Sequence, residues 1–316
     1  MAQQRLRRSV LACPGSNPRM MEKAAASIAD EVFLDLEDAC APLEKPAARL
    51  RVVEALTTHD WGSKVRVVRI NQVRSRFAFL DLWEVLRGAG SMLDCVMVPK
   101  VQEAGDIAFV DRALDQLEQE LGLEPGRIGI EAQVEEPRGL VSCEAIATAS
   151  PRVETLIFGP ADFSAAMQLP ALTVAGGSPD YPGDIFHYVL VRLAVAARAA
   201  GIQVIDGPYL NIRDVAGYAA AARRAAALGY DGKWVLHPGQ LEACNQAFTP
   251  TQEQFERAEA ILAAYRHATE IERRGAVMLG DEMIDEASRK MATQFHLRGV
   301  AAGLVARPGT ASDLPA

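Results

Sequence analysis

The sequence predicts an α/β fold, a (β/α)8 TIM barrel with a C-terminal helical extension. Short apolar runs alternate with segments rich in Ala, Leu, Glu and Arg from one end of the chain nearly to the other, as in βα units that build a parallel sheet. Eight such runs can be counted, the number that closes a TIM barrel. A doubly wound open sheet is the alternative, but no glycine-rich phosphate-binding motif follows any of the runs.

The elements follow in chain order. The predicted strands are Ser9–Cys13, Glu31–Leu36, Lys64–Ile70, Cys95–Pro99, Ile128–Val134, Thr155–Phe158, Ile202–Ile205 and Lys233–Leu236. The segments between them carry apolar residues at helical spacing, and several begin at Asn, Asp or Pro. The predicted helices are Met20–Ala29, Glu44–Thr57, Phe77–Leu86, Asp106–Leu121, Leu140–Ala149, Ile185–Ala199 and Asp214–Leu228.

Two segments depart from the alternation. Phe163–Gly183 is rich in Pro, Gly, Ser and Asp and has no clear period, which predicts a lid or substrate loop. The eighth unit completes the barrel within residues 1–248, so residues 249–316 form an extension: a helix to about Arg273, a separate piece from Gly275 to Asp285, and a helix from Glu286. We expect this extension to pack outside the barrel or on another subunit, and its last residues to fray.

Composition restricts the class of protein. With 316 residues, 49% of them hydrophobic and 23% charged, the chain is typical of a soluble globular protein. Its net charge of −8 provides no basic face for nucleic acid. Five widely spaced cysteines, an odd number, indicate reduced core residues and a cytoplasmic location. No stretch predicts a signal peptide or a membrane span.

Polar residues follow each predicted strand at its carboxyl end, the face on which TIM-barrel active sites are built. Any one of them could simply cap the next helix or pair with a neighbour. The whole set, however, indicates an active site. It comprises Pro14–Arg19, Asp35–Asp38, Arg69–Asn71, Lys100, Glu135–Glu136, Asp162, Asp206–Pro208 and His237–Gln240.

Glu135 and Asp162 are the metal candidates, because they close neighbouring predicted strands. Mg²⁺ takes one or two carboxylates and leaves its other positions to water and substrate oxygens. The scarcity of histidine argues against zinc. Alternatively, either acid pairs with Arg69 or Lys100. Arg69 itself lies on an apolar run and must find a substrate oxygen or a carboxylate such as that of Asp35 or Glu37.

Other cations near the barrel mouth leave alternatives open. Lys100 is a candidate Schiff-base nucleophile, or a cation that is structural or orients the substrate. His237 precedes a proline and is more typical of a hydrogen-bonding loop residue than of a catalyst. Asn17, Arg19 and Lys23 follow Pro14-Gly15 at a predicted helix start, which suits a phosphate group but equally suits a solvated helix face.

Several motifs in order resemble those of the malyl-CoA/β-methylmalyl-CoA lyases and the citrate-lyase β-subunit-like proteins, acyl-CoA lyases of the phosphoenolpyruvate/pyruvate TIM-barrel superfamily. The resemblance extends from about Arg7 to Met291. Its motifs are Pro14-Gly-Ser-Asn-Pro-Arg-Met-Met-Glu-Lys23, Phe33-Leu-Asp-Leu-Glu-Asp-Ala39, Val68-Arg-Ile-Asn71, Val98-Pro-Lys100, Ile205-Asp-Gly-Pro208, Gly232-Lys-Trp-Val-Leu-His-Pro-Gly-Gln240 and Met283-Ile-Asp285.

The resemblance implies a Mg²⁺-dependent carbon–carbon lyase, with Mn²⁺ as an alternative ion. It would cleave a 3-hydroxy-carboxyacyl-CoA into an acyl-CoA and a 2-oxo acid, or run the reverse condensation. By the same resemblance, Glu135 and Asp162 hold the metal and Arg69 stabilises the oxygen on which negative charge develops. The other residues implied in binding substrate or coenzyme A are Asn17, Arg19, Lys23, Glu37, Asp38, Asp206 and Pro238.

The resemblance also accounts for the extension. The residue matching Asp285 enters the site of a neighbouring subunit and serves as acid or base at the thioester α-carbon, which implies a homotrimer or hexamer. A carboxylate partly removed from water would have the raised basicity that this proton transfer needs. Read from the residues alone, Asp285 is a helix N-cap before Glu286.

Two segments depart from the pattern of the malyl-CoA lyases. A shorter Gly176–Asp184 stands where those enzymes have an aromatic-rich insertion, and Gln133–Arg138 replaces their usual segment. Both border the acyl and oxo-acid pockets, so the substrate class stays open among malyl-CoA, methylmalyl-CoA and citramalyl-CoA types. The alternatives are a citryl-CoA lyase, a metal-independent Schiff-base aldolase, and a non-catalytic CoA-binding subunit.

Overall fold

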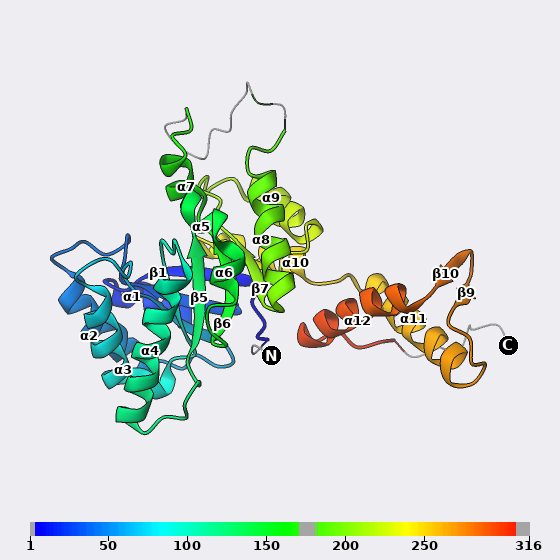
Figure 1. The fold of residues 1–316 in the computed structure, drawn as a ribbon, viewed down its shortest axis with the longest axis horizontal. Helices are drawn as coiled ribbons and strands as arrows, with labels where there is room; N and C mark the ends of the chain where they lie inside the picture. Colours follow the sequence, from blue (N-terminus) through cyan, green and yellow to red (C-terminus); the bar gives the residue numbers. More distant parts are fainter. Residues whose placement is uncertain (1–3, 171–180, 182, 308–316) are drawn as a thin grey trace. The chain divides into compact units, whose positions relative to one another are not determined.

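Eight parallel strands close into a barrel in the computed structural model of the chain, as the sequence predicts (Figure 1). The structure describes residues 4–170, 181 and 183–307. Each strand pairs with its predecessor in the sequence, and the last pairs with the first. The strands are β1 (Ser9–Pro14), β2 (Glu31–Asp35), β3 (Val65–Arg69), β4 (Cys95–Val98), β5 (Gly129–Val134), β6 (Val153–Phe158), β7 (Gln203–Asp206) and β8 (Gly232–Val235). All eight predicted strands are confirmed.

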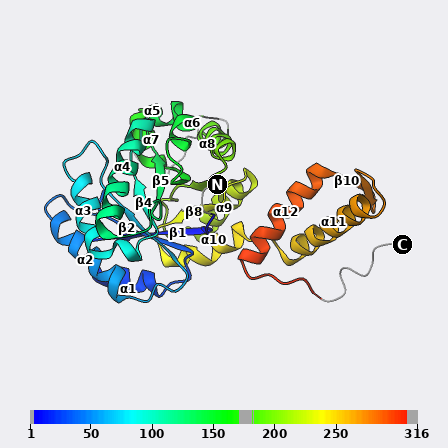
Figure 2. The same cartoon turned by 60° about the horizontal axis from the view of Figure 1, so that its bottom comes forward.

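Helices surround the strands of the barrel (Figure 2). They are α1 (Pro18–Ala25), α2 (Lys45–Thr58), α3 (Ala78–Ala89), α4 (Ala104–Leu121), α5 (Pro137–Val141), α6 (Cys143–Ala147), α7 (Pro160–Ala166), α8 (His187–Ala200), α9 (Val215–Ala227) and α10 (Leu241–Phe248), with 3-10 turns η1 (Gly90–Met92) and η3 (Pro238–Gln240). Local chemistry fixes several starts. Asn17 caps α1 and Asp214 caps α9 through their side chains, and proline occupies the first turn of α1, α2, α5 and α7.

Within the barrel the structure differs from the sequence-based expectations in three places. The helix predicted over Leu140–Ala149 is two short helices, because Ser142 leaves the helical conformation (φ −100°, ψ 9°). The loop predicted from Phe163 to Gly183 begins inside α7, whereas residues 171–180 and 182 of it lie outside the described residues. Helix α10, which follows the eighth strand, was not predicted.

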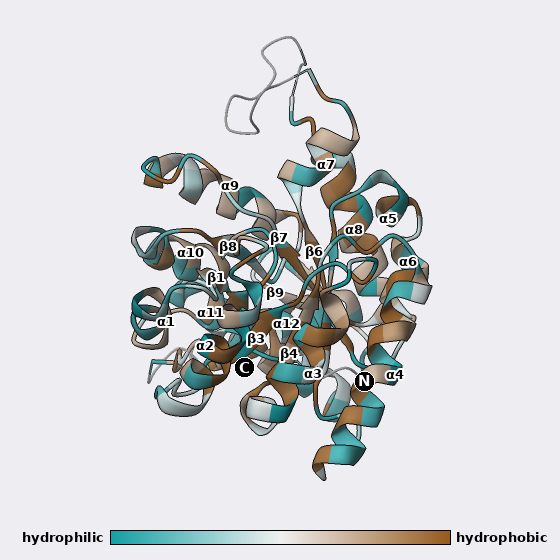
Figure 3. Cartoon of the chain, turned by 90° about the vertical axis from the view of Figure 1, so that its left-hand side faces the viewer, coloured by the Kyte–Doolittle hydropathy of each residue, from teal (hydrophilic) through white to brown (hydrophobic). Residues whose placement is uncertain are grey.

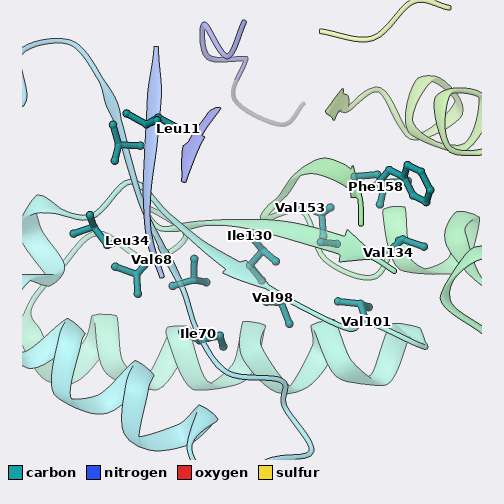
Figure 4. Packing of buried hydrophobic residues seen from close by; sticks show 14 of the residues in the cluster. Leu11, Leu34, Val68, Ile70, Val98, Val101, Ile130, Val134, Val153 and Phe158 are labelled. Atoms are coloured by element: carbon teal, nitrogen blue, oxygen red, sulfur yellow. The ribbon is translucent and has the colours of Figure 1, made fainter. Parts of the chain in front are cut away.

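The apolar core has two parts. The larger lies between the strands and the helices, where outward-facing residues such as Val68, Val98 and Ile130 pack (Figure 4). Helices that cover it alternate hydrophilic and hydrophobic segments (Figure 3). The smaller part fills the barrel and includes Phe33 and Trp234, whose ring centroids are 4.5 Å apart. All five cysteines are buried and unbonded.

Polar layers lie above and below the apolar filling of the barrel. Residues alternate in and out along a strand, so β2 directs Glu31, Phe33 and Asp35 inward. On β5 the inward positions are Glu131, Gln133 and, just after the strand, Glu135. The barrel interior therefore holds one polar layer at the amino ends of the strands, the lower layer, and another at the carboxyl ends, the upper layer.

The chain after Phe248 forms a second unit, Thr249–Ala316. Within it, α11 (Gln252–Glu270) starts at a capping box of Thr251 and Gln254. An antiparallel hairpin of β9 (Val277–Leu279) and β10 (Glu282–Ile284) follows, and then α12 (Glu286–Ala301). The two long helices were predicted, and the hairpin was not. In the part of the chain that the structure describes, no helix is long and apolar enough to cross a membrane.

Candidate active site

Arg69, at the end of β3, is the buried cation of the upper polar layer. Its guanidinium binds both oxygens of Asp35, with Nε–Oδ1 2.8 Å and Nη2–Oδ2 2.6 Å. It lies 5.5 Å from the Phe33 ring centroid and 5.4 Å from that of Trp234, so the apolar filling supports it from below. Burial disfavours its charge, but Asp35 outweighs that effect and raises the pKa of Arg69. The structural ion pair that was expected as one alternative is thus formed with Asp35. It uses Nε and Nη2 and leaves Nη1 for other acceptors.

Two acids from the β2 loop reach the same end of the barrel. Glu37 is buried, and its Oε2 lies 3.4 Å from Arg69 Nη1 while its Oε1 lies 2.5 Å from Lys100 Nζ. Burial raises the pKa of Glu37 to about 7, against the opposing charge of Arg69. Asp38 is largely exposed, and its ion pair with Lys100, 3.1 Å long, overcomes partial burial and lowers the pKa of Asp38.

Glu135 is held at both carboxylate oxygens. The Lys100 backbone N–H donates to Oε1 (2.8 Å), and the Gln133 amide donates to Oε2 (2.5 Å). Gln133 also accepts from Arg69 Nη1 at 3.4 Å. Glu135 is 1% exposed, and burial, opposed by Arg69 and reinforced by Asp162, raises the pKa of Glu135 to about 8. A cation that binds here would displace a proton at neutral pH.

Asp162 lies in the first turn of α7, close enough to Glu135 for the two charges to interact. Its Oδ1 is 3.6 Å from Lys100 Nζ, and its side chain is 40% exposed. Gly159 allows the close approach, because a Cβ there would lie 2.4 Å from Glu135 Oε2. No three His, Cys, Asp or Glu side chains among the described residues are grouped to hold a metal ion. Two carboxylates with unused lone pairs, open to water on one side, fit Mg²⁺ rather than an ion that needs a full protein cage.

Lys100 is poorly suited to form a Schiff base. Partial burial would lower its pKa, but the hydrogen bond and charge of Glu37 outweigh burial and raise it. A Schiff-base lysine must instead lose its proton easily, which usually requires an apolar pocket or a neighbouring cation. The geometry therefore favours the other interpretation, in which Lys100 acts as a cation.

Two other predicted residues lie at the same end of the barrel. The Asp206 carboxylate, at the end of β7, pairs with Lys233 Nζ (2.6 Å) and accepts from its neighbour Gly207 (2.9 Å). Its side chain is thus occupied by a buried ion pair. Pro238 is exposed in η3, where the His237 ring accepts a hydrogen bond from the Gly239 N–H (3.1 Å), as expected for a loop histidine.

The residues predicted to bind phosphate lie on α1. Asn17 Oδ1 accepts from Met20 N at 3.2 Å, so it acts as the helix cap. Arg19 and Lys23 are exposed, and neither forms an ion pair with any described residue. These two cations are therefore available to an anionic ligand, although the alternative of a solvated helix face describes them equally well.

Asp285 lies in the second unit, at the start of α12. It caps that helix by accepting from Ser288 N at 3.0 Å, as its sequence context predicts. This hydrogen bond lowers the pKa of Asp285. The raised basicity expected of a proton-transfer group is consequently not a property of the single chain, and it would have to come from the environment that Asp285 meets elsewhere.

The site also contains residues that the sequence reasoning did not single out. Gln133 joins Arg69 to Glu135, and Lys45 Nζ supports the β2 loop by donating to the carbonyls of Leu36 and Glu37 (2.7 and 2.8 Å). The alternation Glu131, Gln133, Glu135 was a usable signal for Gln133, since it places three polar side chains on the inward face of one strand. Lys45 had no comparable signal.

Known proteins resemble this chain over most of its length. A profile of the family described as HpcH/HpaI aldolase/citrate lyase matches residues 8–238. An L-malyl-CoA/beta-methylmalyl-CoA lyase of Cereibacter sphaeroides is 38% identical over 288 residues, 88% of this chain and 90% of the relative. A citrate lyase subunit beta of Haemophilus influenzae is 36% identical over 283 residues, 89% of this chain and 92% of the relative. The resemblance noted from the motifs is thereby confirmed.

Solved structures extend the comparison. The protein CitE of Mycobacterium tuberculosis, crystallised with magnesium, acetoacetate and coenzyme A, has a TM-score of 0.71 and 30% identity, covering 92% of this chain and 97% of that one. A citrate lyase of Burkholderia xenovorans shares the fold, with a TM-score of 0.83 at 24% identity over 96% of this chain and 94% of that one. The chain belongs to the HpcH/HpaI aldolase/citrate lyase family.

Proposed function

We propose that this protein is a Mg²⁺-dependent carbon–carbon lyase that acts reversibly on a 3-hydroxy-carboxyacyl-CoA, giving an acyl-CoA and a 2-oxo acid. The observation that carries the proposal is the meeting of Arg69, Glu135 and Asp162 at the carboxyl end of one barrel. Its support from relatives is the similarity to named malyl-CoA/methylmalyl-CoA lyases and to a CitE protein crystallised with magnesium and coenzyme A.

Each residue has a separate task in this proposal. Glu135 and Asp162 would hold Mg²⁺, which supplies Lewis-acid polarisation of the oxo-acid oxygens when bound. Arg69 is held by Asp35 and lies over the Phe33 and Trp234 rings. Its Nη1 would face the substrate oxygen that gains negative charge as the carbon–carbon bond breaks. In cleavage the substrate hydroxyl gives its proton to water at the open mouth and becomes the oxo group, while the electron pair of the broken bond passes to the thioester α-carbon.

That α-carbon must then receive a proton. We assign this step to Asp285 of a neighbouring subunit in a homo-oligomer, on the strength of the family resemblance. In the single chain Asp285 is a solvated helix cap with a lowered pKa. A burial of its carboxyl by a second subunit would raise its basicity, which proton transfer requires. Trimer and hexamer are both compatible with such sharing.

Asp285→Asn tests this assignment. We expect kcat to fall by 10²-fold or more, since general acid–base groups typically contribute 10²–10⁴-fold. Asp285→Asn chains and Arg69-substituted chains should each be inactive alone. When the two are assembled into mixed oligomers, activity should return, because some sites would then combine an intact Arg69 with an intact Asp285. Full activity of Asp285→Asn alone would refute the proton-transfer role. Ser288→Ala, which removes only a partner of the cap, serves as the control.

The substrate itself is identified by assay. Condensation of short acyl-CoAs with a panel of 2-oxo acids, followed together with release of free coenzyme A, would define the pair and show whether a thioester hydrolysis follows. We expect EDTA to abolish turnover. A borohydride-trapped adduct at Lys100, with activity that survives EDTA, would overturn the metal mechanism in favour of the Schiff-base aldolase. Purified protein that turns over none of malyl-CoA, citramalyl-CoA and citryl-CoA would favour the non-catalytic subunit.

A further inference from the structure

Lys100 adopts an unusual backbone conformation beside the candidate metal site. Its φ is 52°, in the left-handed region that residues with a Cβ rarely occupy. Such strain persists only where the surroundings hold it, and it is concentrated at functional sites. The residue directly follows Pro99 at the end of β4, so the chain turns sharply there.

The strained turn directs the Lys100 N–H at Glu135. The hydrogen bond to Oε1 is 2.8 Å long, and the next residue, Val101, bonds its N–H to the carbonyl of Gln133 at 3.1 Å. The backbone of this turn is therefore tied both to Gln133 on β5 and to the side chain of Glu135 just after that strand. It fixes one oxygen of the carboxylate while leaving that oxygen a second lone pair.

The ammonium of the same residue contacts three further carboxylates. Nζ lies 2.5 Å from Glu37, 3.1 Å from Asp38 and 3.6 Å from Asp162. With Glu135, four acids thus converge on the two ends of Lys100. Arg69 also pairs with Glu37 at 3.4 Å, whereas the ion pairs of Asp38 and Asp162 are with Lys100, and without it these acids would repel one another.

We propose that Lys100 is a positioning residue whose ammonium serves as the internal counter-cation of the mouth, holding Glu37, Asp38 and Asp162 together and competing with the divalent metal for Asp162. The inference rests on the proposed function. A cation next to a ligand lowers the affinity of that ligand for a second cation. When the metal binds, the two shorter contacts, to Glu37 and Asp38, keep the ammonium in place and the longer one to Asp162 is lost.

The proposal predicts a split that a purely structural lysine would not give. In Lys100→Met we expect Mn²⁺, used alone as the probe, to bind about tenfold more tightly, since a unit charge at this distance near a protein surface is worth at least one tenfold step. At the same time kcat should fall about tenfold or more, because Glu37 and Asp38 lose their anchor. Lys100→Arg should restore affinity toward the wild-type value.

Lys100→Gly separates the backbone from the side chain. It keeps the N–H that binds Glu135 and relieves the strain of the positive φ, so it should remain folded even if Lys100→Met does not. We expect it to match Lys100→Met in tighter Mn²⁺ binding. Lys64→Met changes the net charge equally, away from the mouth, and should bind Mn²⁺ as the wild type does.

Titration by electron paramagnetic resonance of free Mn²⁺, on the full chain without substrates, gives the affinities, and steady-state assays give kcat and KM. Unchanged or weaker Mn²⁺ binding by both Lys100→Met and Lys100→Gly, in a wild type that binds Mn²⁺ and turns over substrate, would overturn this inference alone. A wild type that binds no Mn²⁺ would overturn the proposed function and this inference with it.

Discussion

The two polar layers inside the barrel each combine one buried arginine with acids from β2 and β5, but they differ in how far the arginine is already occupied. Strand β2 supplies Glu31 to the lower layer and Asp35 to the upper one, while β5 supplies Glu131 below and the chain just after it supplies Glu135 above. Each layer is centred on one buried arginine, Arg7 below and Arg69 above. The difference lies in how completely each guanidinium is used.

In the lower layer Arg7 is saturated. Its guanidinium contacts Glu31 (2.7 Å), Glu131 (3.0 Å) and Glu154 (2.5 Å), and it also donates to Gln203 and Cys95. Arg5 shares Glu154 from the other side at 3.0 Å. Arg5 also lies 3.6 Å from Asp94, so the two guanidiniums face four carboxyl groups, each mostly or fully buried. We therefore interpret this layer as structural.

In the upper layer the charges stay partly unused. Asp35 accepts hydrogen bonds from Nε and Nη2 of Arg69. The remaining nitrogen, Nη1, lies 3.4 Å from both Gln133 Oε1 and Glu37 Oε2. Asp162 is open to water. An arginine whose contacts are complete holds a fold together, whereas one with a spare donor beside open carboxylates is available to a ligand. The following substitutions test this contrast.

The largest expected effect is on Arg7. Arg7→Met leaves buried carboxyl groups without their counter-charge, and breaking such a pair typically costs about 3–5 kcal/mol of stability. Urea unfolding followed by circular dichroism should show the midpoint falling by a matching amount. Arg192→Met, at the exposed pair with Glu144, should cost about 1 kcal/mol or less. Equal losses for the two variants would mean that the lower layer is no more critical than the surface.

Arg69→Lys should give the reverse pattern, with a small loss of stability and a large loss of rate. Lysine cannot reproduce the two-point contact with Asp35 and the spare donor together. Removing one preorganised donor of this kind costs about 10²–10³-fold in kcat. Steady-state kinetics with the identified substrate would check it. If kcat is unchanged while the unfolding midpoint falls, Arg69 belongs with Arg7 as a structural cation.

The smallest expected effect is a pH dependence of stability that arises in the lower layer. Burial and the neighbouring charge of Glu131 raise the pKa of Glu31 well above its usual value, and Glu31 Oε1 and Glu131 Oε2 accept no hydrogen bond from a described donor. The folded state therefore holds a proton that the unfolded state releases above about pH 4.3. The contribution of this proton to stability is fully present below that pH and declines as pH rises toward the folded pKa of Glu31, by up to about 1.4 kcal/mol per pH unit.

Glu31→Gln mimics the protonated acid and should remove the part of the slope that Glu31 contributes, while the raised pKa values of Glu37 and Glu135 keep theirs. Urea midpoints measured from pH 5 to pH 8 would show the variant losing less stability across the range than the wild type. Substitution of both acids, Glu31→Gln with Glu131→Gln, should be less stable than either single change, because Arg7 then keeps only Glu154. Equal slopes of stability against pH for the wild type and Glu31→Gln would contradict the proton that the folded state is expected to hold at Glu31.

Much of the fold could be predicted because its signals are local. The eight strands are short apolar runs with polar residues at their carboxyl ends, and βα alternation leaves few topologies. The common location of the two candidate metal acids also follows from position alone, since Glu135 directly follows β5 and Asp162 lies in the helical turn after the neighbouring β6. What was missed lacks such a signal: the β9–β10 hairpin has strands of only three residues, and the break at Ser142 depends on local hydrogen bonding.

The candidate site could be predicted in outline and not in detail. That Arg69 needs a carboxylate was clear from an arginine on an apolar run. Its choice of Asp35 over Glu37 depends on the β2–β3 register, which places Asp35 directly opposite Arg69. The left-handed turn of Lys100, which carries its N–H to Glu135, follows from neither propensity nor pattern.

The sequence by itself determined which residues reach the barrel mouth, because strand order and the two-residue alternation of side chains are encoded along the chain. Only the tertiary structure decided which of those charges are consumed by one another. Arg7 and Arg69 look alike in sequence, each beside a strand rich in apolar residues. Closure of the barrel surrounds Arg7 with acids on all sides and leaves Arg69 at an open end, where water and a ligand can reach its neighbours.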